Sequence, residues 1–268
     1  MNIHLPAPFS WPGPAATVLA FGAAAACLAS RVNGATLLIN AARDGVLYEE
    51  STGASANGAG DYLLAGRTNQ SSGSRRRSLL FFDLTGLPSG AIIMSATVQL
   101  QAVPVATTSE MLSLHRVLAS WTTATSDPAG NESAGVAALT GDTSWLYASF
   151  PSTLWAVPGG DHATTPSASL AAGPSGGEML WTSPSMAADV QAWGADPASN
   201  HGWMLRSGET IPQTAKRFDS ASGLDPALRP VLMIEYGIIP EPECSVTALV
   251  GLGWLLQLRR RSTSSLVP

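Results

Sequence analysis

Short runs of β-forming residues, separated by turn residues, make up most of the chain. Apolar and polar side chains alternate most clearly in Ala96-Thr97-Val98-Gln99-Leu100-Gln101 and in Leu112-Ser113-Leu114-His115. A period of two predicts strands with one buried and one solvated face. We expect strands at residues 36–40, 45–49, 62–66, 78–83, 95–103, 111–117, 179–182, 202–207, 215–219 and 230–236.

A helical pattern follows the seventh of these strands. Met186, Val190 and Trp193 recur at positions i, i+4 and i+7, so in a helix they share one face. Ser185 can cap the start of this helix, and Asp196-Pro197 predicts its end. We therefore expect one short helix in an otherwise β-rich chain.

The links between the expected strands are rich in glycine, proline and serine. Residues 51–60 and 161–177 are predicted to be long loops, which in sandwich folds tend to be functional or mobile. Many short strands joined in this way are typical of sandwiches and jelly rolls. The predicted fold class is an all-β jelly-roll sandwich with one short helix, over residues 35–237.

Residues 1–34 are predicted to be a signal peptide. The apolar stretch at residues 15–29 suits the hydrophobic region of a signal and is short for a membrane span. Small residues at cleavage-like spacing follow it, up to Gly34. The alternatives are a buried N-terminal helix, which Pro12 and Pro14 disfavour, and a lipoprotein cleavage box that ends at Cys27.

Residues 238–268 carry three elements in order. Pro240, Glu241 and Pro242 come first, an apolar run at residues 244–258 follows, and a basic cluster closes the series. This order resembles the PEP-CTERM sorting signal of exopolysaccharide-producing Gram-negative bacteria. The resemblance implies an exosortase-type processing enzyme as partner, a hydrophobic helix held transiently in the inner membrane, and delivery to the cell surface or the medium. A plain tail anchor is the alternative. The basic cluster consists of Arg259, Arg260 and Arg261.

Charge and cysteine content restrict the partners further. Residues 35–237 contain ten Lys and Arg against seventeen Asp and Glu, which gives a formal charge of −7. Because so acidic a domain has no field that gathers phosphates, we expect no nucleic-acid partner. Cys27 and Cys244 both lie in the end segments, so residues 35–237 fold without a disulfide.

Several stretches between residues 35 and 236 occur in an order that resembles the DNRLRE domain. The resemblance implies a jelly-roll sandwich of exported bacterial proteins, related to carbohydrate-binding modules of polysaccharide-degrading enzymes. The chain departs from that pattern after Ser220, where Ala221-Ser222 stand in place of Arg-Glu. The stretches that carry the resemblance are residues 77–84, 87–91, 95–100, 115–117, 121–122, 189–193, 200–205, 216–220 and 229–232.

Two groups of side chains are candidates for contact with a sugar. Trp145, Tyr147 and Trp155 lie among Gly, Asp, Thr, Ser and Pro, so they are the aromatic residues most expected to be exposed and to stack on sugar rings. Packing in the core is the alternative for all three. The basic triplet could grip an anionic sugar, or it could be a solvated strand edge. The triplet consists of Arg75, Arg76 and Arg77. Three other tryptophans, Trp181, Trp193 and Trp203, are expected in the core.

The remaining motifs do not predict catalysis. Residues 173–177 match the nucleophile pattern G-x-S-x-G, but a loop precedes them and a strand-like run follows, where the chemistry needs a strand and then a helix. No carboxylate pair for glycoside cleavage stands out. The chain is therefore predicted not to be an enzyme.

The sequence predicts no metal site. The three histidines that follow the signal lack zinc-binding spacing and are expected to be structural. Calcium is the one cofactor left open, because three oxygen-bearing side chains could coordinate it. The histidines are His115, His162 and His201, and the possible calcium ligands are Asp44, Asn57 and Asp61.

Together these features predict an exported, surface-sorted and non-catalytic module that binds or helps build an extracellular polysaccharide matrix. Two alternatives stay open. The protein could be a purely structural surface protein without a glycan site, or a polysaccharide lyase or hydrolase whose active site the sequence does not reveal. Neither the glycan nor the oligomeric state follows from the sequence.

Overall fold

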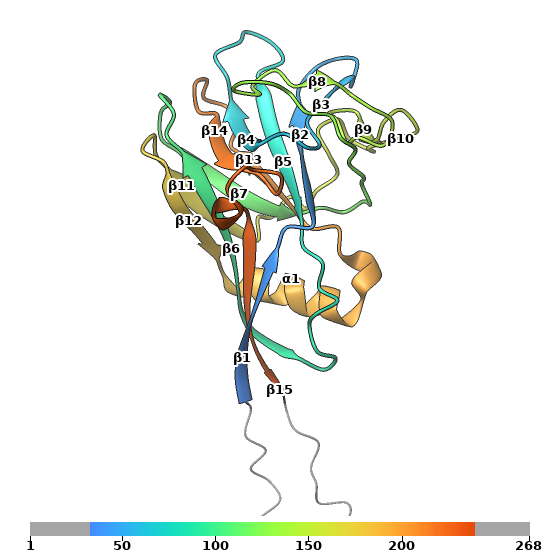
Figure 1. Cartoon of the computed structure of the whole chain (residues 1–268), viewed down its shortest axis with the longest axis vertical. Coiled ribbons are helices and arrows are strands. Elements are labelled where there is room, and N and C mark those ends of the chain that lie inside the picture. Colours follow the sequence, from blue (N-terminus) through green and yellow to red (C-terminus); the bar gives the residue numbers. More distant parts are fainter. Residues whose placement is uncertain (1–32, 239–268) are drawn as a thin grey trace, which may run out of the picture. The chain divides into compact units, whose positions relative to one another are not determined.

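Ten strands overlap the ten segments that the alternation of apolar and polar residues predicts. They belong to a computed structural model in which residues 33–238 are described (Figure 1). The ten are β1 (Asn33–Asn40), β2 (Arg43–Tyr48), β4 (Tyr62–Arg67), β5 (Arg75–Phe81), β6 (Ile92–Val103), β7 (Glu110–Arg116), β12 (Gly177–Thr182), β13 (Trp203–Ser207), β14 (Lys216–Asp219) and β15 (Val231–Ile238).

Five further strands lie in segments that the sequence did not mark as strands. The prediction of a loop at residues 161–177 is wrong in part, because β11 pairs antiparallel with β7, from Ala168 opposite Leu114 to Ala172 opposite Glu110. The small residues of β11 have little intrinsic strand preference, and its partner strand supplies the order. The five are β3 (Ser55–Ala56), β8 (Val136–Ala137), β9 (Tyr147–Ser149), β10 (Thr153–Leu154) and β11 (Ala168–Ala172).

The main sheet has eleven strands, and each of its described registers is antiparallel. Its order is β1-β15-β6-β14-β4-β5-β13-β7-β11, with β12 also paired to β6 and β2 also paired to β5. The sheet changes direction at β4, which continues from β14 to β5 through only two residue pairs. Gly66 lies at this point with a φ of 121°, and a Cβ there would stand 2.8 Å from Ala215 Cα. Only glycine fits such a turn of the backbone.

The two halves of the curled sheet enclose one hydrophobic core, so the fold is all-β and sandwich-like. Val98 and Leu100 of β6 belong to the same buried cluster as Leu114 of β7 and Leu205 of β13. Their neighbours along β6 alternate between buried and half-buried positions, as the sequence pattern predicts.

A second core covers the outer face of the central strands. Leu47 of β2, Leu79 of β5 and Met204 of β13 point into it, whereas Val46 and Leu80 point into the first core. These strands are therefore buried on both faces. This double burial explains why residues 79–82 read as a continuous apolar run without alternation.

The helix α1 (Pro184–Ala195) packs against β6, and its predicted face is correct. Met186, Val190 and Trp193 are all buried. The predicted cap is wrong, because the Oγ of Ser183 rather than that of Ser185 accepts the Met186 N–H, at 3.1 Å. Ser183 precedes Pro184, and proline suits the first turn of a helix because it has no N–H to leave unpaired.

Tryptophans complete the first core, as expected. The rings of Trp193 and Trp203 meet edge to face with centroids 4.5 Å apart, and Trp181 is buried beside Phe218. The buried carboxylate of Asp189 accepts from Trp203 Nε1 at 2.9 Å. Two short 3₁₀ turns follow: η2 (Pro197–Ser199) lies between α1 and β13, and η3 (Pro226–Leu228) lies between β14 and β15.

Candidate functional site

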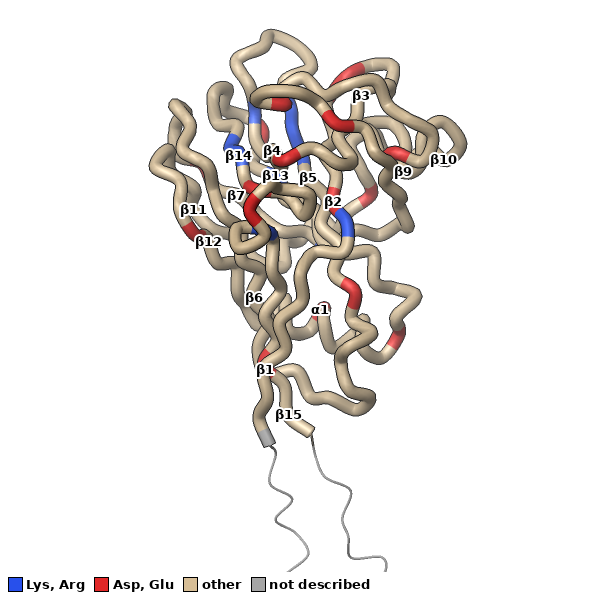
Figure 2. The backbone as a smooth tube through the Cα atoms, viewed as in Figure 1, with Lys and Arg blue, Asp and Glu red and all other residues tan. Residues whose placement is uncertain are grey.

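The three arginines at the start of β5 do not share one surface, because successive residues of a strand point to opposite faces. Arg75 and Arg77 both approach Glu209, whereas Arg76 lies over the ring of Tyr48, 5.1 Å from its centroid. Figure 2 shows acidic residues close to this basic stretch. The alternative of a solvated strand edge is wrong, since β5 pairs with β2, β4 and β13 and two of its arginines are buried.

Glu209 joins Arg77 to two further arginines. Its carboxylate accepts from Arg77 Nε at 2.6 Å and Nη2 at 2.8 Å, and from Arg206 Nη2 at 3.0 Å, and it lies 3.9 Å from Arg75 Nη1. The side chains of Arg77 and Glu209 are only 6% and 5% exposed. Arg77 Nη1 also donates to Gly159 O at 2.6 Å. Arg77 is thus fully used inside the protein and has no free donor face for a sugar.

Arg76 has no carboxylate within ion-pair distance among the described residues. Its Nε donates to Ser133 O at 2.9 Å, and its Nη1 donates to Gly73 O and Arg75 O at 2.9 and 2.8 Å. Burial lowers the pKa of Arg76. Its guanidinium therefore forms a largely buried, positively charged wall beside the groove described next.

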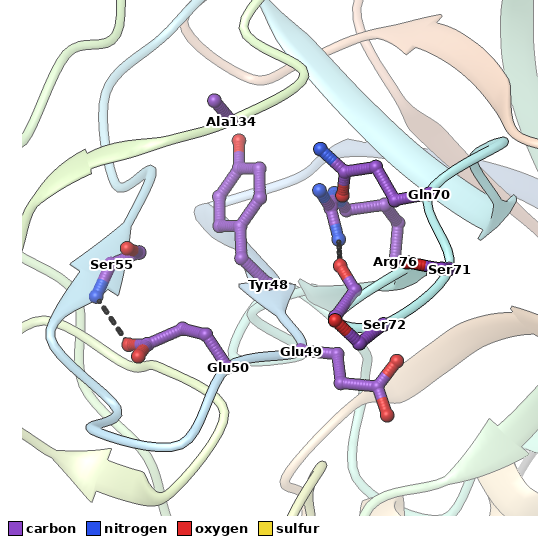
Figure 3. Close-up of a pocket in the computed structure, with 10 residues that line it drawn as sticks. Tyr48, Glu49, Glu50, Ser55, Gln70, Ser71, Ser72, Arg76 and Ala134 are labelled. Carbon is purple, nitrogen blue, oxygen red and sulfur yellow. Dashed lines mark hydrogen bonds between the residues drawn. The ribbon is translucent and has the colours of Figure 1, made fainter.

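A polar groove opens beside Arg76 (Figure 3). Three adjoining hollows share Glu49, Ser72 and Gly73, with volumes of about 510, 490 and 330 Å³. We call them together the Glu49 groove. Its polar lining side chains come from the end of β2, the turn between β4 and β5, and β5 itself. They include Glu49, Glu50, Gln70, Ser71, Ser72 and Arg76.

The turn between β4 and β5 forms one wall of the Glu49 groove. Gly73 adopts a φ of 60°, and a Cβ there would stand 2.8 Å from Glu49 O. Glycine at this position lets the turn approach β2 closely. The exposed tip of the turn consists of Gln70, Ser71 and Ser72.

Three carboxylates line the groove, those of Glu49, Glu50 and Glu209, and the first two are held by hydrogen bonds just as Glu209 is held by its arginines. Glu49 accepts from Arg75 Nε at 2.8 Å, and this contact lowers the pKa of Glu49. Burial raises the pKa of Glu50, but hydrogen bonds from Thr52, Ser55 and Ala54 outweigh it and hold the pKa below its usual range. In Figure 3 the carboxylate of Glu50 points toward Ser55 and that of Glu49 points away from Arg76.

The expected exposure of the aromatic set is wrong for both tryptophans. Trp145 is 4% exposed and Trp155 is 5% exposed, and both pack in the second core with Leu47 and Met204. Trp155 Nε1 donates to the backbone O of Ser144 at 3.0 Å. Polar, turn-forming neighbours suggested a surface loop, but this loop lies over the outer face of the sheet and needs large apolar rings beneath it.

The rings of Tyr147 and Trp145 also make contacts within the protein. Tyr147 is half-buried on β9 and meets Phe150 edge to face, with centroids 5.2 Å apart. Trp145 lines the Glu49 groove only by its edge, because the guanidinium groups of Arg75 and Arg77 lie 5.0 and 4.8 Å from its ring centroid. The buried Trp145 ring therefore offers no open face for a sugar.

Two of the three calcium candidates, Asn57 and Asp44, already use a side-chain oxygen to accept from a backbone N–H group. Asn57 Oδ1 accepts from Gly60 N at 2.8 Å, and Asn57 Nδ2 donates to the buried carboxylate of Glu132, which also accepts from Asp61 N. Within residues 33–238, no group of three or more His, Cys, Asp or Glu side chains is arranged to hold a metal ion.

Asp44 is the most perturbed of these acids. Burial raises the pKa of Asp44 to about 7; the hydrogen bond from Ala221 N, 2.6 Å long, opposes this shift and nearby Glu132 adds to it. Ala221 is the position at which the DNRLRE resemblance leads one to expect arginine. Among the described residues no cation lies within 4 Å of the Asp44 carboxylate.

The remaining candidates have structural surroundings. The G-x-S-x-G match forms the turn between β11 and β12, without the helix that a nucleophile elbow needs. His115 lies on β7, as predicted, and its Nδ1 lies 2.8 Å from Ala163 O.

Several predicted features fall outside the described residues. These are the signal peptide and the sorting residues Pro240, Glu241, Pro242, Arg259, Arg260 and Arg261. Across residues 33–238, none of the helices has the length and apolar character needed to cross a membrane.

Comparison with known proteins adds no identity. No family model matches the chain, and no curated protein matches it. Among solved structures, one similar chain belongs to an assembly titled "KBV activated particle at acidic pH". It is 12% identical, the match covers 91% of this chain and 85% of that chain, and the TM-score is 0.23. At so low a TM-score the likeness carries no argument.

We predict that Trp155→Ala destabilises the fold by about 3–5 kcal/mol, because it removes a large buried ring and leaves a cavity. Leu154→Ala is the matched control, since Leu154 is 64% exposed, and its effect should stay within about 0.5 kcal/mol. Urea unfolding of both variants measures the difference. Equal stabilities would contradict the assignment of Trp155 to the core.

Asp44 should make stability depend on pH. Its pKa of about 7 in the folded protein exceeds the ordinary 3.8, so the unfolded chain releases this proton first as the pH rises. The stability linked to Asp44 is therefore full below about pH 4, falls from there to about pH 7, and stays low above it. We predict that Asp44→Asn raises the free energy of unfolding at about pH 8 by up to about 4 kcal/mol, and much less at about pH 4. Urea unfolding at both pH values tests this, and an equal effect at both would refute it.

Proposed function

We propose that this chain is an exported, surface-sorted and non-catalytic module that uses the Glu49 groove to bind extracellular polysaccharide. The observation that carries the proposal is the chemistry of the groove. Serine hydroxyls, the Gln70 amide, the Arg76 guanidinium and two fixed carboxylates line it together. Such a set of donors and acceptors matches the hydroxyl groups of a sugar.

The size of the groove fits this proposal. Its hollows have volumes of about 510, 490 and 330 Å³, within the range of about 300–1,000 Å³ common for ligand sites. Because they adjoin one another along the turn between β4 and β5, more than one sugar unit of a chain could be held. A polymer with repeating units suits such a series.

Binding in this groove would depend on hydrogen bonds rather than on stacking. The rings of Tyr48 and Trp145 border the groove, but both side chains are buried. Each hydrogen bond adds only about 0.5–1.5 kcal/mol, and more if one partner is charged. We therefore propose modest affinity for a single unit, with Arg76 as the strongest contact.

The paired state of Glu49 and Glu50 supports a non-catalytic role. Glycoside hydrolysis commonly needs one carboxyl whose pKa is raised so that it can donate a proton. Glu49 and Glu50 both have lowered pKa values, because Arg75 holds Glu49 and three residues of the following turn hold Glu50. Neither is suited to act as a general acid near neutral pH.

The two ends of the chain support the proposed location. The apolar stretch at residues 15–29 suits a signal peptide, and the order Pro-Glu-Pro, apolar run and arginine cluster resembles a PEP-CTERM signal. We propose residues 1–34 as signal, 35–237 as a jelly-roll DNRLRE-like domain and 238–268 as sorting tail. An exosortase-type enzyme would then process the tail at the inner membrane before surface delivery.

The first test changes the exposed tip of the groove. Gln70→Ala combined with Ser72→Ala should weaken glycan binding by about tenfold, because two hydrogen-bonding side chains are lost. The melting temperature should hardly change, since both residues are exposed. Ser185→Ala on α1 is the matched control and should bind like the wild type. A glycan panel measured at low and high salt reads out affinity.

Each outcome of that experiment separates the alternatives. Binding that weakens with salt indicates an anionic glycan held at Arg76, and salt-insensitive binding indicates a neutral one. No binding to any glycan would leave a purely structural surface protein. Release of new reducing ends would show a hydrolase instead, and an unaltered affinity of the double variant would exclude the groove as the site.

The second test concerns sorting. Replacing Pro240, Glu241 and Pro242 together by alanine should leave the protein in the inner membrane, because the processing enzyme would lose its recognition motif. A plain tail anchor would not respond, since the apolar run at residues 244–258 is unchanged. Cell fractionation of the native host measures the distribution, and normal surface delivery of the variant would refute the sorting signal.

A further inference from the structure

His162 holds together three segments that are distant in the sequence. Its Nδ1 lies 2.8 Å from Gly160 O, and its Nε2 lies 2.7 Å from Arg206 Nη1 on β13. Its backbone forms an isolated bridge with Val117, at the end of β7. Arg206 Nη2 in turn donates to Glu209 at 3.0 Å. The segment at residues 156–163 is thus tied to the ion-pair network around Arg77.

These contacts define the protonation state of the ring. The Gly160 carbonyl can only accept a hydrogen bond, so Nδ1 must carry a hydrogen. The Arg206 guanidinium can only donate, so Nε2 must present its lone pair. Both contacts exist at once only in the neutral imidazole with its hydrogen on Nδ1.

Protonation of His162 Nε2 would place its N–H donor opposite the N–H donor of Arg206 Nη1. The charged groups that face His162 are Arg206, Arg77 and Glu209, and His115 meets it edge to face at a centroid distance of 5.4 Å. Two of them are permanently positive. The only negative group, Glu209, is already shared among Arg77, Arg206 and Arg75. An imidazolium therefore loses its contact with Arg206 and gains no free partner.

We propose that His162 is an acid-sensitive latch: the neutral ring fastens residues 156–163 to β13 through Arg206, and protonation removes that contact. The latch holds residues 156–163, which in turn contact the second core. Gly159 accepts from Arg77 Nη1 at 2.6 Å, and its N–H donates to Trp145 O at 2.6 Å. Residues 156–163 keep their backbone bonds to Arg116 and Leu118, so loss of the Arg206 contact loosens, without detaching, the cover over Trp145, which borders the Glu49 groove.

The direction of the pH effect follows from the surroundings of the ring. Burial, and then Arg206 and Arg77, lower the pKa of His162 against the opposing hydrogen bond to Gly160 and the charge of Glu209. The neutral form is thus favoured in the folded state. Stability from the latch is full above the ordinary histidine pKa of about 6.5 and is lost as the pH falls through the lower folded value.

Hydrogen exchange of the purified full-length chain tests the latch. After correction for intrinsic rates, amides of residues 156–163 should lose protection by about tenfold between roughly pH 7.5 and pH 5, as expected for loss of one hydrogen bond to a charged group. His162→Gln keeps an acceptor for Arg206 and cannot titrate, so its protection should not change with pH. His162→Lys carries a permanent charge and should show the reduced, acid-like protection at both pH values.

His201→Gln is the matched control, because His201 also has a lowered pKa but lies outside this network. It should show the wild-type response. Imidazole ¹⁵N shifts of the wild type give a test that needs no variant, with Nδ1–H expected at neutral pH. An Nε2–H tautomer, or an acid response that persists in His162→Gln, would overturn the proposal.

Discussion

The buried pair of Arg77 and Glu209 is the interaction on which the loops around β5 and β13 depend. Removing two charges from water is costly, and the cost is met only if geometry and further hydrogen bonds are good. Here the contact is bidentate, Arg206 shares the carboxylate, and the Gly159 carbonyl accepts from Nη1 of Arg77. The strand β5 is thereby joined to the loop after β13 and to residues 156–163, which cover the second core.

The same strand shows why a basic triplet on a strand differs from a basic patch. Alternation sends Arg75 and Arg77 toward Glu209 and sends Arg76 toward Tyr48, so the three charges act in different environments. Two of them stabilise the fold through carboxylates. Of the three, Arg76 alone has no carboxylate within ion-pair distance, and it lines the first hollow of the groove, whereas Arg75 and Glu209 line the third as a paired set.

The sequence predicted the strands well where one face is solvated, because apolar and polar residues then alternate with the buried and exposed positions. It predicted less where the tertiary environment overrides local preference. Trp145 and Trp155 looked exposed from their neighbours, since no local signal shows that a loop lies over a second core. Ser183 and Ser185 are equally good caps in sequence, and only the position of Pro184 in the helix decides between them. The Glu49 groove depends on contacts between residues far apart, such as Arg76 with Ser133, which one sequence cannot reveal.

Two buried glutamates show how the loops beside the groove are fixed. Glu132 and Glu209 both adopt positive φ, at 56° and 59°, a conformation that costs non-glycine residues about 1–2 kcal/mol. Each offsets this strain because its carboxylate accepts several hydrogen bonds, from Asn57 and the chain after it in one case and from arginines in the other. The strain persists because the surrounding contacts determine the backbone. Loops held in this way lose little further freedom when a ligand binds, so a groove without stacking rings can still bind through a few hydrogen bonds.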